Sequence, residues 1–170
     1  TLFRSRKHLA DRVTNPYEGE IATKLRDILT SSVRDHLVSD VPVGIFLSAG
    51  LDSTTLAGLA SEISSTSLIS MTLQFKELSG SLMDEAPLAA EVASIYGMQH
   101  TTRTVIGSEF RNEINSLFAS MDQPSIDGAN TYFVAKEAAS MGLKVALSGL
   151  GGDELFGGYP SFQQIPRLVN

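Results

Sequence analysis

The fifteen residues from Val41 to Thr55, VPVGIFLSAGLDSTT, decide the fold of this 170-residue chain. The first seven carry no charge and are mostly apolar, as in a strand that is buried on both faces of a sheet. The apolar run stops at Ser48, and apolar residues then recur at helical spacing as far as Ile63. The stretch therefore predicts a strand, a short loop and a helix, in that order.

Strand and helix patterns alternate along the rest of the chain. Further strands are predicted over 68–75, 99–105 and 144–147. Helices are predicted over 20–37, 108–120 and 130–141, and one more helix is expected to begin at the cap Asp84 and to stop at Gly97. Repeated alternation of this kind indicates an α/β fold, a Rossmann-like parallel sheet of about five strands with helices on both faces. Ligands of such sheets bind at the carboxyl ends of the strands.

Residues 1–17 have little hydrophobic periodicity and read as a linker, so the domain is expected over 18–170. A hydrophobic content of 42% and a charged content of 19% suit one folded domain. A formal charge of −6 argues against a broad nucleic-acid surface. There is no cysteine, and no apolar run approaches the ~20 residues of a membrane span. We expect a soluble, cytoplasmic protein without nucleic-acid or membrane partners.

The loop from Ser48 to Ser53 has the composition of a phosphate site. Small residues let the backbone approach a ligand closely, and the free N–H groups at a helix start attract anions. Asp52 would repel a phosphate unless a cation such as Mg²⁺ lies between them. From the spacing alone, a second interpretation is equally good: Asp52 or Ser53 caps the helix, and Gly50 only makes the turn.

Three familiar loops do not fit this chain. A Walker loop requires a lysine before its Ser or Thr, and the loop at 48–55 has none. A nucleophile elbow requires glycine two residues before Ser48, where Phe46 stands. The dinucleotide fingerprint starting at Gly149 fails because Glu154 occupies the place of its last glycine.

A second unusual loop, Ser148 to Tyr159, follows the last predicted strand and reads SGLGGDELFGGY. Its five glycines are entropically costly to order, which favours a backbone shaped around a ligand over a simple connector. Two adjacent carboxylates, Asp153 and Glu154, lie within it. A mobile surface loop with solvated acids is the alternative interpretation.

Together the two loops resemble a known family. The segment Ser48 to Ser53 is similar to the pyrophosphate loop of N-type ATP pyrophosphatases, which reads Ser-Gly-Gly-Leu-Asp-Ser. The segment Ser148 to Tyr159 resembles the Ser-Gly-Glu-Gly-x-Asp-Glu signature of asparagine synthetases and β-lactam-forming synthetases. The resemblance spans most of 20–159. It implies the adenine nucleotide α-hydrolase type of fold, and a partial domain that is truncated at its C-terminus.

The resemblance also implies a ligase that uses ATP and Mg²⁺. A substrate carboxylate, from aspartate or a related acid, would be adenylated with release of pyrophosphate and then amidated by ammonia from a separate glutaminase domain. The position of each residue in the motifs implies three sets of contacts. The pyrophosphate would be held by Ser48, Gly50, Asp52 and Ser53, and Mg²⁺ would be held by the catalytic pair Asp52 and Asp153. The nucleoside would be contacted by Leu47, Leu73, Ser148 and Gly149. A homodimer is compatible with the family.

Two positions depart from the family pattern. Leu150 stands where asparagine synthetases carry a Glu, and Asp127 stands where they place an Arg for the aspartate. The ATP chemistry is therefore expected to be retained and the second substrate to differ. A tRNA-modifying ATP pyrophosphatase and a degenerate nucleotide-binding module remain as alternatives. The family also supplies a lysine beyond the second loop, where this chain has only Arg167.

Overall fold

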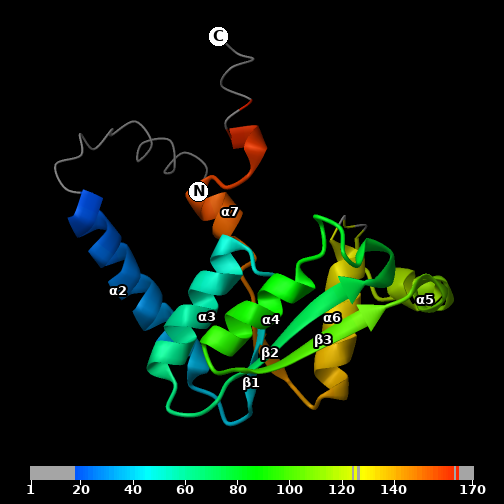
Figure 1. Cartoon of the computed structure of the whole chain (residues 1–170), viewed down its shortest axis with the longest axis horizontal. Helices are drawn as coiled ribbons and strands as arrows, with labels where there is room; N and C mark the ends of the chain where they lie inside the picture. The colour runs from blue at the N-terminus through cyan, green and yellow to red at the C-terminus, as the bar shows by residue number, and fades with distance from the viewer. Residues whose placement is uncertain (1–17, 124, 126, 163, 165–170) are drawn as a thin grey trace.

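The computed structural model describes residues 18–123, 125, 127–162 and 164, so the predicted linker over 1–17 and Arg167 lie outside the described residues. Helices and strands alternate through most of this part of the chain (Figure 1). The strands are β1 (Val43–Phe46), β2 (Ile69–Phe75), β3 (Gln99–Val105) and β4 (Val145–Leu147). The helices are α2 (Glu18–Leu37), α3 (Leu51–Ile63), α4 (Ala86–Ile95), α5 (Gly107–Ala119), α6 (Gly128–Ser140) and α7 (Gly152–Phe156), with a 3-10 turn η1 (Lys76–Leu78).

The four strands form one sheet in the order β3-β2-β1-β4, and all three neighbouring pairs are parallel. β1 lies between β2 and β4, with Phe46 opposite Met71 and Ile45 opposite Leu147. The carboxyl ends of the strands therefore meet at one edge, which we call the upper edge. Each of the four stretches that were predicted as strands forms one, which gives four strands in the described part where about five were expected.

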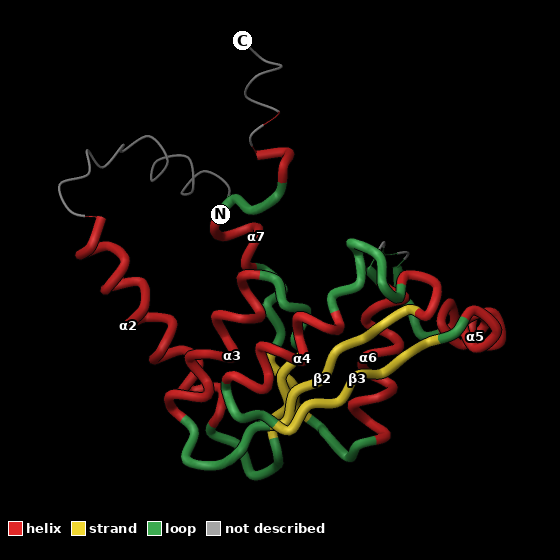
Figure 2. The backbone as a smooth tube through the Cα atoms, viewed as in Figure 1, coloured by secondary structure: helices red, strands yellow, loops and turns green. Residues whose placement is uncertain are grey.

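Each face of the sheet has its own core, because side chains alternate along a strand. On one face Ile45 and Leu47 pack with Val33 of α2 and with buried alanines of α3 and α4. On the other face Phe46 packs with Met71 and with Ala138 of α6. Figure 2 shows helices on both sides of the strands, as the sequence predicted. None of the helices in the described part of the chain is long and apolar enough to cross a membrane.

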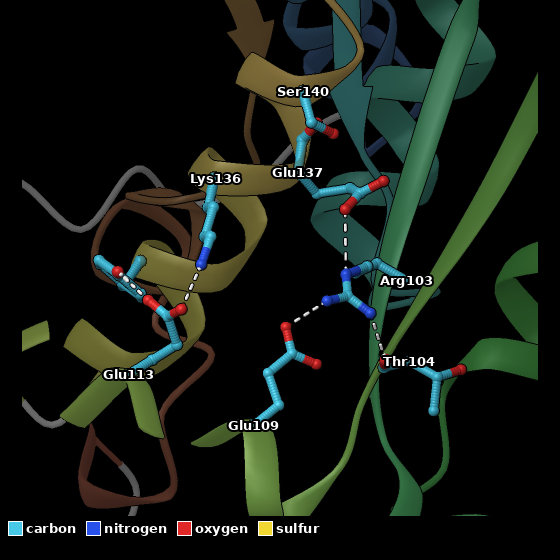
Figure 3. Close-up of polar contacts among 8 residues, drawn as sticks. Arg103, Thr104, Glu109, Glu113, Lys136, Glu137 and Ser140 are labelled. Atoms are coloured by element: carbon cyan, nitrogen blue, oxygen red, sulfur yellow. Dashed lines mark hydrogen bonds and ion pairs between the residues drawn. The ribbon is translucent and has the colours of Figure 1, made fainter. Parts of the chain in front are cut away.

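An ion-pair network joins α5 and α6 to β3 (Figure 3). The Arg103 guanidinium of β3 pairs with Glu109 of α5, and its Nε lies 3.0 Å from Oε2 of Glu137 on α6. Lys136 Nζ lies 2.7 Å from Oε1 of Glu113, which joins the same two helices a second time. These groups are only partly exposed, so the pairs help to fix α5 and α6 against the end of β3.

Most element bounds agree with the sequence patterns, and the differences have local causes. Gly97 and Gly142 have φ angles of +63° and +76°, which explains why the helices before them stop there. The region 148–159, which was read as a loop, contains the short helix α7. Its five residues are too few to display helical periodicity, and left-handed glycines, Gly151 and Gly157, bound it on both sides.

Candidate functional site

The first loop lies where the sequence placed it. It joins the end of the central strand β1 at Phe46 to the start of α3 at Leu51, at the upper edge of the sheet. Ser53 is only 4% exposed, and its Oγ accepts from the Ser48 N–H at 3.2 Å, lies 3.1 Å from Ser48 Oγ and donates to the Gly50 carbonyl at 3.1 Å. The loop is thus held in shape by its own hydroxyls.

The helix start beside this loop has groups left for a ligand. α3 has no side-chain cap, although either Asp52 or Ser53 was a candidate for one, so its first N–H groups are not used by a capping side chain. In addition, the Thr54 Oγ1 is buried without a hydrogen-bond partner among the described residues. Unpaired donors at a helix N-terminus, together with the positive end of the helix dipole, suit an anion.

Leu47 directly follows β1, and Leu73 lies near the carboxyl end of the neighbouring strand β2. The Leu47 side chain is 2% exposed and belongs to the core, so only its backbone could reach a nucleoside. Its N–H donates to the Met71 carbonyl at 2.9 Å, and its carbonyl accepts from the Thr72 hydroxyl, so both groups already have partners. Leu73 is half-buried and follows Thr72 on β2. These two predicted contacts therefore lie at the upper edge, next to Ser48.

The second loop rests directly on the first. A Cβ on Gly149 would lie 3.0 Å from the Ser53 nitrogen and 3.1 Å from Asp52 Cβ. A Cβ on Gly152 would lie 2.1 Å from Asp52 Oδ2. A side chain at Gly149 would therefore be tightly packed against the first loop, and one at Gly152 would force the Asp52 carboxylate or the second loop to move. Figure 1 shows α7 beyond the N-terminal end of α3, consistent with these contacts.

Asp153 begins the first turn of α7, immediately after the glycine that touches the Asp52 carboxylate. Its own carboxylate lies against Gly158, where a Cβ would be 1.9 Å from Oδ1. Next to it the Tyr159 hydroxyl donates to Glu154 at 2.8 Å. This hydrogen bond is the main cause that raises the pKa of Tyr159, and burial and the charges of Glu154, Asp153 and Asp127 act in the same direction.

The predicted site residues are thus gathered at one edge, coming from the loops after β1 and β4 and from the end of β2.

Two features were missed by the sequence analysis. Gly152 touches Asp52, a contact whose only signal was the density of glycines. Asp84, predicted as a helix cap, does accept from the Ala86 N–H at 3.3 Å, but it also accepts hydrogen bonds from Gln74 and Gly80. His100 is partly buried, and its Nδ1 lies 3.0 Å from Ser70 Oγ. It does not belong to any group of three potential metal ligands among the described residues.

The sequence has clear relatives. A family model described as asparagine synthase matches residues 24–170. The chain is 38% identical to the glutamine-hydrolysing asparagine synthetase 1 of Bacillus subtilis over 149 residues, which cover 86% of this chain and 23% of that protein. It is 33% identical to the amidase chry2 of Gibberella zeae over 163 residues, covering 86% of this chain and 24% of that one.

A solved structure supports the fold. The NH3-dependent NAD synthetase from Campylobacter jejuni, in complex with the nitrate ion, superposes with a TM-score of 0.50 over 81% of this chain and 60% of that chain. Sequence identity is 16%, so this similarity concerns the arrangement of strands and helices. It agrees with the adenine nucleotide α-hydrolase type of sheet that the two loops predicted.

Proposed function

Because the chain belongs to the asparagine synthase family, we propose that it is the ATP-using part of an amide-forming ligase. The chain spans 23% of the length of its Bacillus relative, so the complete reaction is proposed for the whole protein. In this proposal the chain adenylates a substrate carboxylate, and ammonia from glutamine, released in a glutaminase domain elsewhere in the protein, then forms the amide.

One observation carries the proposal: the second loop lies against Asp52 and Ser53 of the first loop through Gly149 and Gly152. Loops that are about a hundred residues apart in sequence thereby form one surface, which combines free helix N–H groups, hydroxyls and carboxylates. A triphosphate needs this combination, since N–H groups and hydroxyls bind its oxygens while a carboxylate-bound cation offsets its charge.

Carboxylates at this edge of the sheet are ligands of the kind that Mg²⁺ prefers. We propose that Asp52 and Asp153 would hold the ion, which would offset the charge of the departing pyrophosphate. Mg²⁺ usually takes only one or two carboxylates and completes its shell with phosphate oxygens and water.

The chemistry follows from this arrangement. An oxygen of the substrate carboxylate attacks the α-phosphorus of ATP, and the bond from that phosphorus to the pyrophosphate oxygen breaks. Free N–H groups at the start of α3 and the Thr54 hydroxyl stabilise the pyrophosphate as its negative charge grows. Ammonia then attacks the acyl carbon and loses a proton, and AMP leaves with the electrons of the carbon–oxygen bond.

The acid substrate is proposed to differ from aspartate. Leu150 lies in the second loop and is 78% exposed, in the place where a glutamate was expected from the family pattern. Asp127 is exposed at the start of α6, and its charge adds to the rise in the pKa of Tyr159 that the hydrogen bond to Glu154 mainly causes. An exposed leucine and a carboxylate would bind the carboxylate-bearing side chain of aspartate poorly. A relative that is named an amidase supports a wider range of substrates in this family.

The test is ATP–pyrophosphate exchange in the complete protein, with a panel of carboxylic acids that includes aspartate. The proposal expects radioactive pyrophosphate to enter ATP only when one of the acids is present, and it expects an acid other than aspartate to give the higher rate. Exchange that is absent with every acid, in a protein that still binds ATP, would favour a degenerate nucleotide-binding module instead.

A further inference from the structure

Asp84 has more hydrogen bonds than a helix cap needs. It lies in the segment between β2 and α4, and its Oδ2 accepts from the Gly80 N–H at 2.8 Å. The Gln74 side-chain amide donates to its two oxygens at 3.0 and 3.1 Å, and the Ala86 N–H donates at 3.3 Å. One carboxylate thus joins the end of β2, the middle of the following segment and the first residue of α4.

The network continues into the sheet. The Thr104 hydroxyl of β3 donates to Gln74 Oε1 at 2.9 Å, so both polar ends of the Gln74 amide are engaged. Nearby, Glu77 Oε1 accepts from the Gly107 N–H at 2.8 Å, which joins η1 to the start of α5. The segment from Lys76 to Glu85 is therefore attached to β2, α4 and α5 by polar contacts, and through Gln74 of β2 it is linked to β3.

This segment stands at the edge that holds the two loops. β2 runs parallel to β1 with Met71 opposite Phe46, so Leu73 and Gln74 lie beyond the end of β1, beside Ser48. Figures 1 and 2 show the segment after β2 at the same side of the sheet as the N-terminal end of α3. Two apolar side chains at its tip, Leu82 and Met83, are 108% and 72% exposed and make no core.

A cap alone does not explain these contacts. Helix α4 requires only the bond to Ala86, and it is also held by its buried residues Ala86, Ala89 and Ala93. The bonds from Gly80 and Gln74 stabilise the segment and the strand end instead. The Gly80 N–H and then the Gln74 amide hold the pKa of Asp84 below its ordinary value, because both donate hydrogen bonds to the carboxylate.

We propose that Asp84 is a positioning residue for the nucleotide: through Gln74 and Gly80 it fixes the end of β2 and the segment 76–85 as the wall against which the nucleoside of ATP binds. The proposal rests on the function proposed above. In this proposal Asp84 does not contact the nucleotide itself but holds the neighbouring residues that do. The exposed side chains of Leu82 and Met83 would then cover the bound nucleoside.

The experiment measures ATP–pyrophosphate exchange in the complete protein at varied ATP concentration. In Asp84→Ala the KM for ATP should rise about tenfold, as expected when a set of charge-assisted hydrogen bonds is lost, while kcat changes much less. Asp84→Asn retains one acceptor oxygen and should give an intermediate KM. The control is Asp35→Ala, an exposed aspartate on α2 far from this edge, which should leave both constants unchanged.

A second variant keeps the test decisive if Asp84→Ala does not fold. Gln74→Ala removes the link to β2 and should also raise the KM for ATP, and the double variant should be no worse than the more severe single one. An unchanged KM in folded variants, or a fall in kcat that parallels a fall in unfolding temperature, would overturn the proposal. If the wild type neither binds ATP nor exchanges pyrophosphate, the proposed function fails, and this inference fails with it.

Discussion

The two loops at the upper edge of the sheet reach their shapes by opposite means. The first, Ser48 to Ser53, is short and partly buried, and its serine hydroxyls hold its own backbone. The second, Ser148 to Gly158, exposes Leu150 and Leu155 by 78% and 80% and bends at left-handed glycines. The first loop is therefore sensitive to the loss of its serine hydroxyls, and the second to the addition of side-chain atoms at its glycines.

The largest effect is expected when a methyl group is added where the loops meet. In Gly152→Ala the new Cβ would lie 2.1 Å from Asp52 Oδ2, so the carboxylate or the second loop must move. A displacement of about 1 Å at a reacting centre can reduce a rate about 100-fold, and we expect a loss of this size in ATP–pyrophosphate exchange. Gly19→Ala on α2, where a Cβ meets no atom within 4 Å, is the matched control. Normal exchange in Gly152→Ala would show that the loops do not act together.

Removal of a hydroxyl from the first loop should have the next largest effect. Ser53→Ala leaves the Ser48 N–H without its acceptor in a partly buried place, at a cost of about 1–3 kcal/mol of folding free energy. Ser61→Ala, farther along α3, removes only a bond to the Gly58 carbonyl within the same helix and should be nearly neutral. Thermal unfolding of both variants compares the two sites. Equal stability would mean that the serines of the loop do not maintain its shape.

A smaller gain in stability is expected at Ala49. Its φ of +57° lies in the left-handed region, which is unfavourable for a residue with a side chain, and the pyrophosphate loop that it resembles has glycine there. Ala49→Gly should stabilise the protein by roughly 0.5–1 kcal/mol, because the relief of strain exceeds the extra entropy of the unfolded chain. A lower unfolding temperature would contradict a strained first loop.

The smallest effect concerns pH. The pKa of Asp84 is lowered from its ordinary value of 3.8, chiefly by the Gly80 N–H. A carboxyl whose pKa is lower in the folded state contributes stability that is present above the unfolded value and is lost as pH falls through the folded one. The difference in unfolding temperature between wild type and Asp84→Asn should therefore be constant above about pH 4 and shrink below it. A difference that grows on acidification would show that Asp84 acts by another route.

The sheet could be predicted because its signal is local. The run from Val43 to Leu47 is apolar at every position but Gly44, and in the structure Ile45 and Phe46 face opposite cores, as a doubly covered strand requires. The position of Ser48 between a central strand and a helix is confirmed by the order of elements. Each of these conclusions needed only residues that are close together in the sequence.

The contacts of the site could be predicted only in part because their partners are distant. No residue near Gly152 in the sequence predicts its contact with Asp52. From the sequence alone Asp84 is interpreted as a helix cap, and its hydrogen bond with Gln74, ten residues earlier on β2, is seen only in the structure. The shared Mg²⁺ site of Asp52 and Asp153 stays a prediction. The weak ATP binding and absent turnover expected of the 170-residue piece by itself stay predictions as well.

The most direct test of the central claim, that both loops bind one nucleotide, is a crystal structure of the complete protein with a non-hydrolysable ATP analogue and Mn²⁺ in place of Mg²⁺. The anomalous signal locates the ion without assumptions about the protein. The account predicts one peak within about 2.0–2.3 Å of carboxylate oxygens from both Asp52 and Asp153, with the terminal phosphates at the start of α3. A peak bound by neither aspartate, or a nucleotide at the opposite edge of the sheet, would contradict it.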